Sequence, residues 1–244
     1  QNREETTFLS RLHSYVGKAW YRRKVSVPKD WRGKDIRFVM ERTKPTHVYV
    51  DGKFVGQSDD IQTAQVYDLS EYLSPGEHEI AVLVDNGQSV PPQVIASSHA
   101  YSESTQTNWN GIIGRIALEA REQLHISDVQ VYPDVASRSV WVRVSLASPH
   151  LVRKGMRVSL NAEAWNTSVP HRAGKLELPL SPSQGEYLWQ YALGGEAQLW
   201  SEFHPALYRL TVKLEGGDER TVDFGLRQFS VCGTQFAVNG HKTF

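Results

Sequence analysis

The sequence predicts an all-β protein, and three observations support this prediction. Short runs of alternating apolar and polar residues recur along the 244 residues, and a two-residue period is typical of a strand with one buried face. Turn-forming pairs such as Asp51-Gly52 and Pro75-Gly76 separate the runs, because these residue types adopt the backbone angles of tight turns. The sequence shows no sustained period of about 3.6 residues, which would indicate an amphipathic helix.

The predicted strands follow one another in short segments. In chain order they are residues 18–27, 35–40, 46–50, 78–84, 111–118, 139–146, 156–165 and 207–214. Many short strands with turns between them are typical of antiparallel β-sandwiches. A polar cluster, EAREQ at residues 119–123, separates the strand at 111–118 from a new strand run that begins at Leu124. We therefore expect two domains, with a boundary near Arg121.

Composition excludes several classes of partner. The chain has 27 basic and 27 acidic residues, so no net field attracts a phosphate backbone, and we expect no nucleic-acid partner. No apolar run reaches the roughly 18 residues that a membrane-spanning helix needs, so we expect no membrane insertion. The single Cys232 cannot close an internal disulfide and fits either cytoplasm or an oxidising compartment. Because the sequence starts at Gln1, we expect a mature or trimmed chain.

The sequence carries no convincing catalytic centre. Glycosidases need two carboxyl groups roughly 5 to 9 Å apart, and Asp59-Asp60 is the obvious acidic pair. Neighbouring side chains on a strand point to opposite faces, and in a loop the two would be solvated turn residues, so we assign no catalytic role. Metal-ligand spacings, a nucleophile elbow and a phosphate-binding loop are also missing. We predict no cofactor and no transition metal, while structural calcium with oxygen ligands stays open.

One loop has the chemical groups that a sugar requires. In TQTNWNGIIGR, residues 105–115, Trp109 lies between Asn108 and Asn110. An indole covers the apolar face of a pyranose, and amides offer donors and acceptors to its hydroxyls. His99 and Tyr101 lie just upstream and would line the same rim. The alternative is a hairpin in which Asn110 and its neighbouring glycine form the turn and the indole packs into the end of the sandwich.

Four tryptophans of the second half sit in or beside strand runs, and they are Trp141, Trp165, Trp189 and Trp200. Their default role is packing in the core or between domains.

Several ordered segments resemble the non-catalytic front end of glycoside hydrolase family 2, which includes β-galactosidases, β-glucuronidases and β-mannosidases. The segments are residues 19–57, 66–86, 105–118, 199–214, 222–231 and 236–244. Three positions depart from the family pattern. Asp51 replaces the usual Asn of the hairpin, Glu77-His78 stands where an Asn is common, and Gly114 stands where an Arg is common.

The resemblance implies a jelly-roll sugar-binding domain at residues 1–121, an immunoglobulin-like β-sandwich at 122–231 and a linker stub at 232–244. It also implies a parent enzyme that is a retaining, exo-acting β-glycosidase, most similar to β-galactosidase. The nucleophile and the acid/base of such enzymes are Glu residues of a following barrel, so no residue of this chain inherits either role. In some members a loop of the first domain reaches the barrel mouth, and residues 105–111 occupy the matching place.

The resemblance implies a carbohydrate substrate and the chain's own C-terminal barrel as partners. A homo-oligomer is compatible with it, and we favour a periplasmic or secreted location. Two alternatives stay open. A stand-alone carbohydrate-binding or adhesion module would bind glycan through an open aromatic surface without catalysis. A purely structural pair of sandwiches would instead show a large apolar patch without a polar cleft.

Overall fold

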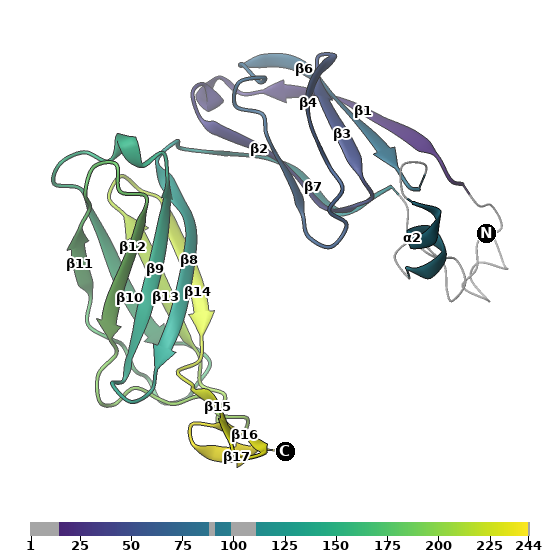
Figure 1. Cartoon of the computed structure of the whole chain (residues 1–244). Coiled ribbons are helices and arrows are strands. Elements are labelled where there is room, and N and C mark those ends of the chain that lie inside the picture. The colour runs from purple at the N-terminus through teal and green to yellow at the C-terminus, as the bar shows by residue number, and fades with distance from the viewer. Residues whose placement is uncertain (1–14, 88–90, 99–110, 244) are drawn as a thin grey trace. The chain divides into compact units, whose positions relative to one another are not determined.

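The computed structural model describes residues 15–87, 91–98 and 111–243. The chain forms two compact units, Gln1–Arg121 and Glu122–Phe244. Both are built from antiparallel strands (Figure 1), which confirms the predicted all-β fold class. Among the described residues, no helix is long and apolar enough to cross a membrane.

The first unit has two facing sheets (Figure 1). One sheet has the order β1-β6-β3-β4, formed by Lys18–Val27, Gly76–Asp85, Thr46–Val50 and Lys53–Ser58. The other has the order β5-β2-β7, formed by Gln65–Asp68, Asp35–Thr43 and Ile112–Arg121. A 3₁₀ turn covers Lys29–Trp31, and a short helix, α2, covers Pro92–Ser97.

Alternation along the strands explains how this core forms. In β3, Val48 and Val50 are buried while Tyr49 between them points to the other face. The largest fully buried apolar side chains of the unit come from both sheets and from the turn after β5, and they are Ile36, Met40, Leu69, Val48 and Val50. The predicted hairpin at Asp51-Gly52 is confirmed, because these residues join β3 to β4 with φ of 49° and 77°.

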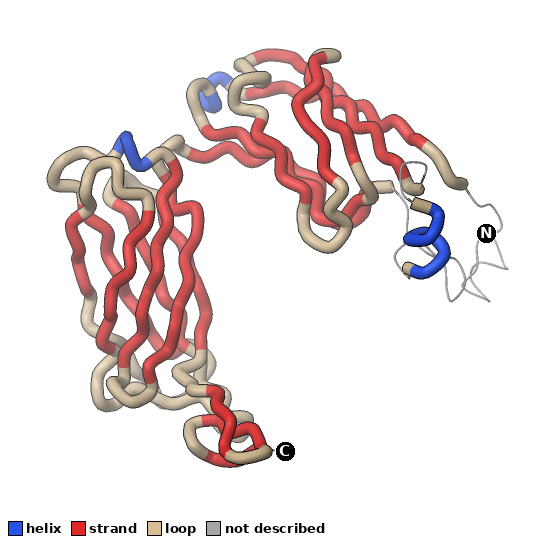
Figure 2. The backbone as a smooth tube through the Cα atoms, in the orientation of Figure 1, coloured by secondary structure: helices blue, strands red, loops and turns tan. Residues whose placement is uncertain are grey.

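The second unit repeats the two-layer plan (Figure 2). One sheet has the order β11-β10-β13-β14, formed by Leu176–Pro179, Arg157–Ala164, Tyr208–Leu214 and Glu219–Phe224. The facing sheet has the order β12-β9-β8, formed by Glu186–Ala192, Ser139–Ala147 and His125–Asp134. A 3₁₀ turn covers Pro149–Leu151. A small sheet, β15-β16-β17, follows at Phe229–Cys232, Gln235–Val238 and His241–Thr243.

The tryptophans of the second unit do not share one environment. Trp189 packs against the core and stacks on Tyr187 with ring centroids 4.8 Å apart, as predicted. Trp141 and Trp165 are 41% and 46% exposed, so a core position is wrong for both. Trp141 lies on the outward face of β9, where the alternation puts every second side chain, and Trp165 directly follows the end of β10 at Ala164.

A β-bulge explains why Gly114 stands where the family pattern has an Arg. The pairing of β2 with β7 shifts between Met40 and Arg42, so that Gly114 and Arg115 together oppose Glu41. Gly114 has φ of 78°, a conformation that glycine adopts without steric cost. The Arg115 backbone N–H donates a hydrogen bond of 2.8 Å to the Glu41 carboxylate. The sequence pattern did not predict this bulge.

Candidate functional site at the loop end of the first unit

All five predicted sugar-contacting residues lie outside the described residues. They are His99, Tyr101, Asn108, Trp109 and Asn110. The structure does describe the framework from which their loop departs and to which it returns. Strand β6 ends at Asp85 before this stretch, and β7 begins at Ile112 after it.

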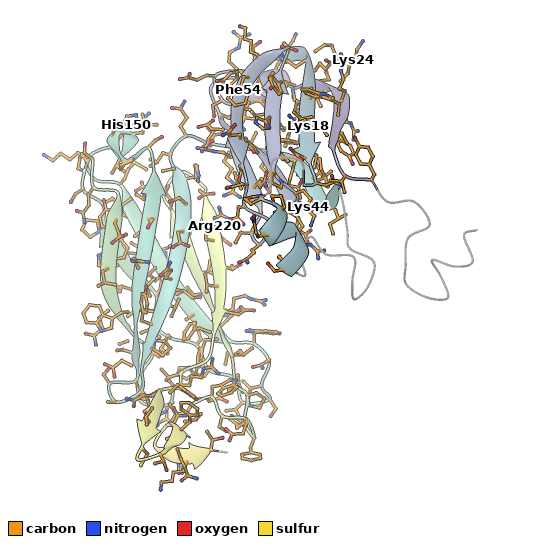
Figure 3. All side chains as sticks on the ribbon, turned by 45° about the vertical axis from the view of Figure 1, so that its right-hand side comes forward. Lys18, Lys24, Lys44, Phe54, His150 and Arg220 are labelled. Carbon is orange, nitrogen blue, oxygen red and sulfur yellow. The ribbon has the colours of Figure 1, made fainter. Side chains whose placement is uncertain are left out.

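The framework is one end of the first sandwich, which we call the loop end. β2 and β6 end here, and β3, β5 and β7 begin here, since Thr46 pairs with Val84 and Thr43 pairs with Ile112. Lys44, which is labelled in Figure 3, lies in the turn between β2 and β3. Gly111, the first described residue after the predicted sugar-contacting residues, precedes β7 at this end.

Buried polar side chains are concentrated at the loop end. They are Thr43, Lys44, Thr46, Gln65 and Asp85, each at most 2% exposed. A polar group removed from water is destabilising unless it is hydrogen-bonded, and a charge needs a partner. This concentration therefore indicates an ordered polar framework at the loop end.

Gln65 is the hub of that framework. Its Nε2 donates to the Asp60 carbonyl oxygen at 2.7 Å and to the Lys44 carbonyl oxygen at 3.4 Å. Its Oε1 lies 2.5 Å from the Thr46 hydroxyl, which is 2.7 Å from the Tyr67 hydroxyl. Burial raises the pKa of Tyr67, so that phenol stays a neutral hydrogen-bonding group. One amide thus fixes the β2–β3 turn, β3, β5 and the loop before β5.

Asp85 and Asn86 fix the departing side of the loop. The Asp85 backbone N–H donates to the Pro45 carbonyl oxygen at 2.9 Å, and the Gly87 N–H donates to Asp85 Oδ1 at 3.1 Å. Asn86 Oδ1 accepts a hydrogen bond of 2.7 Å from the Gly17 N–H, so the chain entering β1 is held at the same end. This pair closes the second family-like segment of the sequence.

Gly111 fixes the returning side. It has φ of 75°, and a Cβ on it would lie 2.4 Å from the Tyr21 hydroxyl oxygen. A larger residue would therefore displace Tyr21 of β1. A cavity of about 560 Å³ opens beside it between the unpaired edges of the two sheets. Its walls include Tyr21, Val25, Ile112, Ile116 and Leu118.

Asp60 serves the turn before β5. Its carboxylate accepts hydrogen bonds from the Gln62 N–H at 2.8 Å, the Thr63 N–H at 3.0 Å and the Thr63 hydroxyl at 2.6 Å. The hydrogen bonds from Thr63, followed by that from Gln62, lower the pKa of Asp60. Because these bonds keep the Asp60 carboxylate ionised and all come from its own turn, Asp60 has a structural role in that turn. Within the described part of the chain, no three His, Cys, Asp or Glu side chains gather where they could hold a metal ion.

Sequence reasoning missed the buried polar framework, although part of it had a signal. In the strand run THVYV, Thr46 shares the core-facing alternation with Val48 and Val50. Gln65 likewise alternates with the buried Tyr67. Lys44 had no such signal, because it lies in a turn where lysine is ordinarily solvated.

Comparison with known proteins assigns both units to one family. Residues 7–118 match the family model for the sugar binding domain of glycosyl hydrolases family 2. Residues 124–227 match a second model described as glycosyl hydrolases family 2. The two matches are adjacent and together cover most of the chain.

Individual relatives agree with this result. A β-galactosidase of Aeromonas hydrophila is 26% identical in an alignment 238 positions long, which covers 90% of this chain and 22% of the relative. A β-galactosidase of Thermoanaerobacter pseudethanolicus is 27% identical in an alignment 250 positions long, which covers 93% of this chain and 32% of the relative. The chain therefore spans about a fifth to about a third of the length of these relatives.

Solved structures show the same fold. A putative β-galactosidase from Bacteroides fragilis superposes with a TM-score of 0.72 at 24% identity, over 96% of this chain and 37% of that one. A β-glucuronidase from Ruminococcus gnavus superposes with a TM-score of 0.66 at 17% identity, over 94% of this chain and 39% of that one. With both domain models matched in order and the fold shared with two such structures, the chain belongs to glycoside hydrolase family 2.

Proposed function

We propose that this chain is the non-catalytic N-terminal portion of a retaining exo-β-glycosidase that is similar to β-galactosidase and removes terminal sugars from oligo- or polysaccharides. The observation that supports this most directly is the pair of adjacent family matches on a chain that spans 22% of a β-galactosidase relative. The two reacting carboxylates would belong to polypeptide beyond residue 244. The proposed partners are the carbohydrate substrate and that C-terminal barrel.

The first unit would shape the sugar pocket through residues 99–110. Support comes from the loop end, where hydrogen bonds link Gln65 of β5 to β3 and to the loop before β5, and hold the chain just after β6 at Asp85. A loop on a rigid base can hold groups such as the Trp109 indole and the Asn108 amide at fixed positions. Positioning of this kind matters because small misplacements of a bound substrate reduce the rate strongly.

Hydrolysis of p-nitrophenyl β-D-galactoside and p-nitrophenyl β-D-glucuronide tests the proposal. We expect no turnover by the 244-residue chain and measurable turnover by a polypeptide that continues through the barrel. Galactoside should be preferred, because the curated relatives above are named β-galactosidases. Turnover by the short chain would show that the division of labour is wrong, and an inactive long polypeptide would remove the glycosidase assignment.

A further inference from the structure

The outer face of the sheet β1-β6-β3-β4 carries a hollow that the proposed function does not use. It has a volume of about 560 Å³. Its lining residues are Trp20, Arg22, Tyr49, Gly52, Glu79 and Ala81. In the strand register, Ala81 of β6 lies between Arg22 of β1 and Tyr49 of β3. The hollow forms because the Ala81 methyl group is much shorter than the side chains on either side of it.

Aromatic side chains form one wall of this hollow and extend beyond it. The rings of Trp20 and Tyr49 have centroids 5.4 Å apart at an angle of 48°. The rings of Tyr49 and Phe54 have centroids 5.4 Å apart at an angle of 60°. Phe54 is labelled in Figure 3. Trp20 is 56% exposed and Phe54 is 50% exposed. The outer face of a sandwich is usually polar, so a row of rings from β1, β3 and β4, of which Trp20 and Phe54 are exposed and Tyr49 is half-buried, indicates a contact surface.

The opposite wall is polar and carries no net charge. Arg22 and Glu79 form a bidentate ion pair, with Nη2 at 2.7 and 2.9 Å from the two carboxylate oxygens and Nε at 3.2 Å from one of them. Among the described residues, Nη1 of Arg22 has no hydrogen-bond partner, so its N–H groups can donate to a ligand. The carboxylate oxygens retain lone pairs that accept from hydroxyl groups. Since the two lining charges neutralise each other, the hollow favours a neutral ligand.

We propose that this hollow binds a neutral glycan. One pyranose would place its C–H face on Trp20 and Tyr49 and direct its hydroxyls at Arg22 and Glu79. An apolar ring face beside a few convergent polar groups matches the two-sided chemistry of a sugar. The tilt between the rings makes a corner rather than a plane, so it suits a single residue of a soluble chain rather than the flat surface of a crystalline polysaccharide. This binding does not depend on hydrolysis.

Affinity electrophoresis of the 244-residue chain tests the proposal. The gels contain β-1,4-galactan, mixed-linkage β-glucan or polygalacturonate, and the dissociation constant follows from the retardation at increasing polysaccharide concentration. We expect retardation by at least one of the two neutral polymers and none by the anionic one. Absence of retardation by both neutral polymers would overturn the proposal, as would retardation by polygalacturonate alone.

Variants locate the binding. Trp20→Ala should raise the dissociation constant for the glycan about tenfold or more. The dissociation constant of Trp20→Phe should lie between those of Trp20→Ala and the parent, because stacking increases with the area of the ring face. Arg22→Met should weaken it while leaving the aromatic wall. Trp141→Ala removes a comparably exposed indole from the second unit, 41% against 56%, and is the matched control that should bind like the parent.

Thermal unfolding checks that each variant is folded. Equal binding by the parent and a folded Trp20→Ala would overturn the assignment to this hollow. A dimer on gel filtration that Trp20→Ala dissociates, together with no glycan binding, would identify the face as a contact between copies of this chain. The nitrophenyl glycoside assay is independent of all these outcomes, so failure of one proposal is distinguishable from failure of the other.

Discussion

His78 and Asp51 form a side-chain pair in the first unit, with Nδ1 of the imidazole 2.6 Å from Oδ2 of the carboxylate. The imidazole Nε2 donates to the Ser74 carbonyl oxygen at 2.7 Å, and the Glu79 N–H donates to Asp51 Oδ1 at 2.8 Å. Both neighbours of the imidazole are acceptors, so the doubly protonated ring satisfies both. Asp51 and His78 are two of the positions where the sequence departs from the family pattern, and the structure joins them.

The pair predicts a pH-dependent stability. The hydrogen bond to Asp51 raises the pKa of His78 above its usual 6.5. The stability that this shift contributes is fully present below pH 6.5, the unfolded-state pKa, and is lost as the pH rises through the folded-state pKa. The pKa of Asp51 is lowered from 3.8, by the Glu79 N–H first and by His78 second, so its contribution is lost only as pH falls through that lowered pKa. The pair should therefore stabilise the first unit most between the lowered pKa of Asp51 and the raised pKa of His78.

The measurement is the melting temperature of the first unit from about pH 6 to about pH 9. In this range Asp51 stays ionised, so only the contribution of His78 to the stability of the pair changes. We expect the parent to lose more stability over this range than His78→Asn, which restores the residue type common in the family. Equal pH slopes for parent and variant would show that the pair makes no net contribution.

The bulge at Gly114 predicts an unusually strong effect of adding one methyl group. A Cβ at this position would lie 2.5 to 2.9 Å from the Glu41 carboxyl group, so Glu41 must move and lose its bond to the Arg115 N–H. Gly114→Ala should therefore lower the free energy of unfolding by the strain of a positive φ, about 1 kcal/mol, plus about 1 kcal/mol for the hydrogen bond.

Two comparisons isolate the second contribution. Gly33 has a similar φ of 74° with nothing within 4 Å of its Cβ position, so Gly33→Ala should show the strain alone. In a Glu41→Ala background, Gly114→Ala should lose its extra effect. If Gly114→Ala lowered the free energy of unfolding equally in the parent and in Glu41→Ala, the hydrogen bond of Glu41 would contribute nothing to the effect of this substitution.

The loop end predicts that Gln65→Leu destabilises the first unit. The substitution removes the donor to the part-buried Asp60 and the buried Lys44 carbonyl oxygens, and leaving a buried acceptor unsatisfied lowers the free energy of unfolding by about 1–3 kcal/mol. Urea unfolding measures this change. Gln57→Leu, on an exposed position of β4, is the control and should stay within about 0.5 kcal/mol of the parent. An equal effect of both variants would contradict the role of Gln65 as a hub.

Alternation and turn chemistry were sufficient to predict the all-β fold and the β3–β4 hairpin. Asp51-Gly52 has a strong local conformational preference, so its turn can be predicted from two residues. The bulge at Gly114 depends on where Glu41 lies across the sheet, which is a non-local relationship. Short strands such as Leu176–Pro179 were missed because four residues give too little pattern to detect.

The candidate site could be predicted only in part. The chemistry of Asn108 and Trp109 indicates a sugar-binding loop, but their contacts lie outside the described residues and the pocket role stays a proposal. The polar framework of the loop end depends on burial of Lys44 and Gln65, which tertiary packing decides. The sequence did not predict the aromatic wall of the hollow either, since Trp20, Tyr49 and Phe54 meet only when the four strands of the sheet β1-β6-β3-β4 are aligned.

The most direct test of the central claim, that the first unit helps to form the sugar pocket of a glycosidase, is kcat/KM for p-nitrophenyl β-D-galactoside in the polypeptide that includes the barrel. Trp109→Ala should reduce kcat/KM by about tenfold, which corresponds to about 1.4 kcal/mol of lost transition-state stabilisation, while Trp165→Ala, an exposed indole of the second unit, should leave it unchanged. An unaltered kcat/KM for a folded Trp109→Ala would contradict the claim and return Trp109 to a structural role.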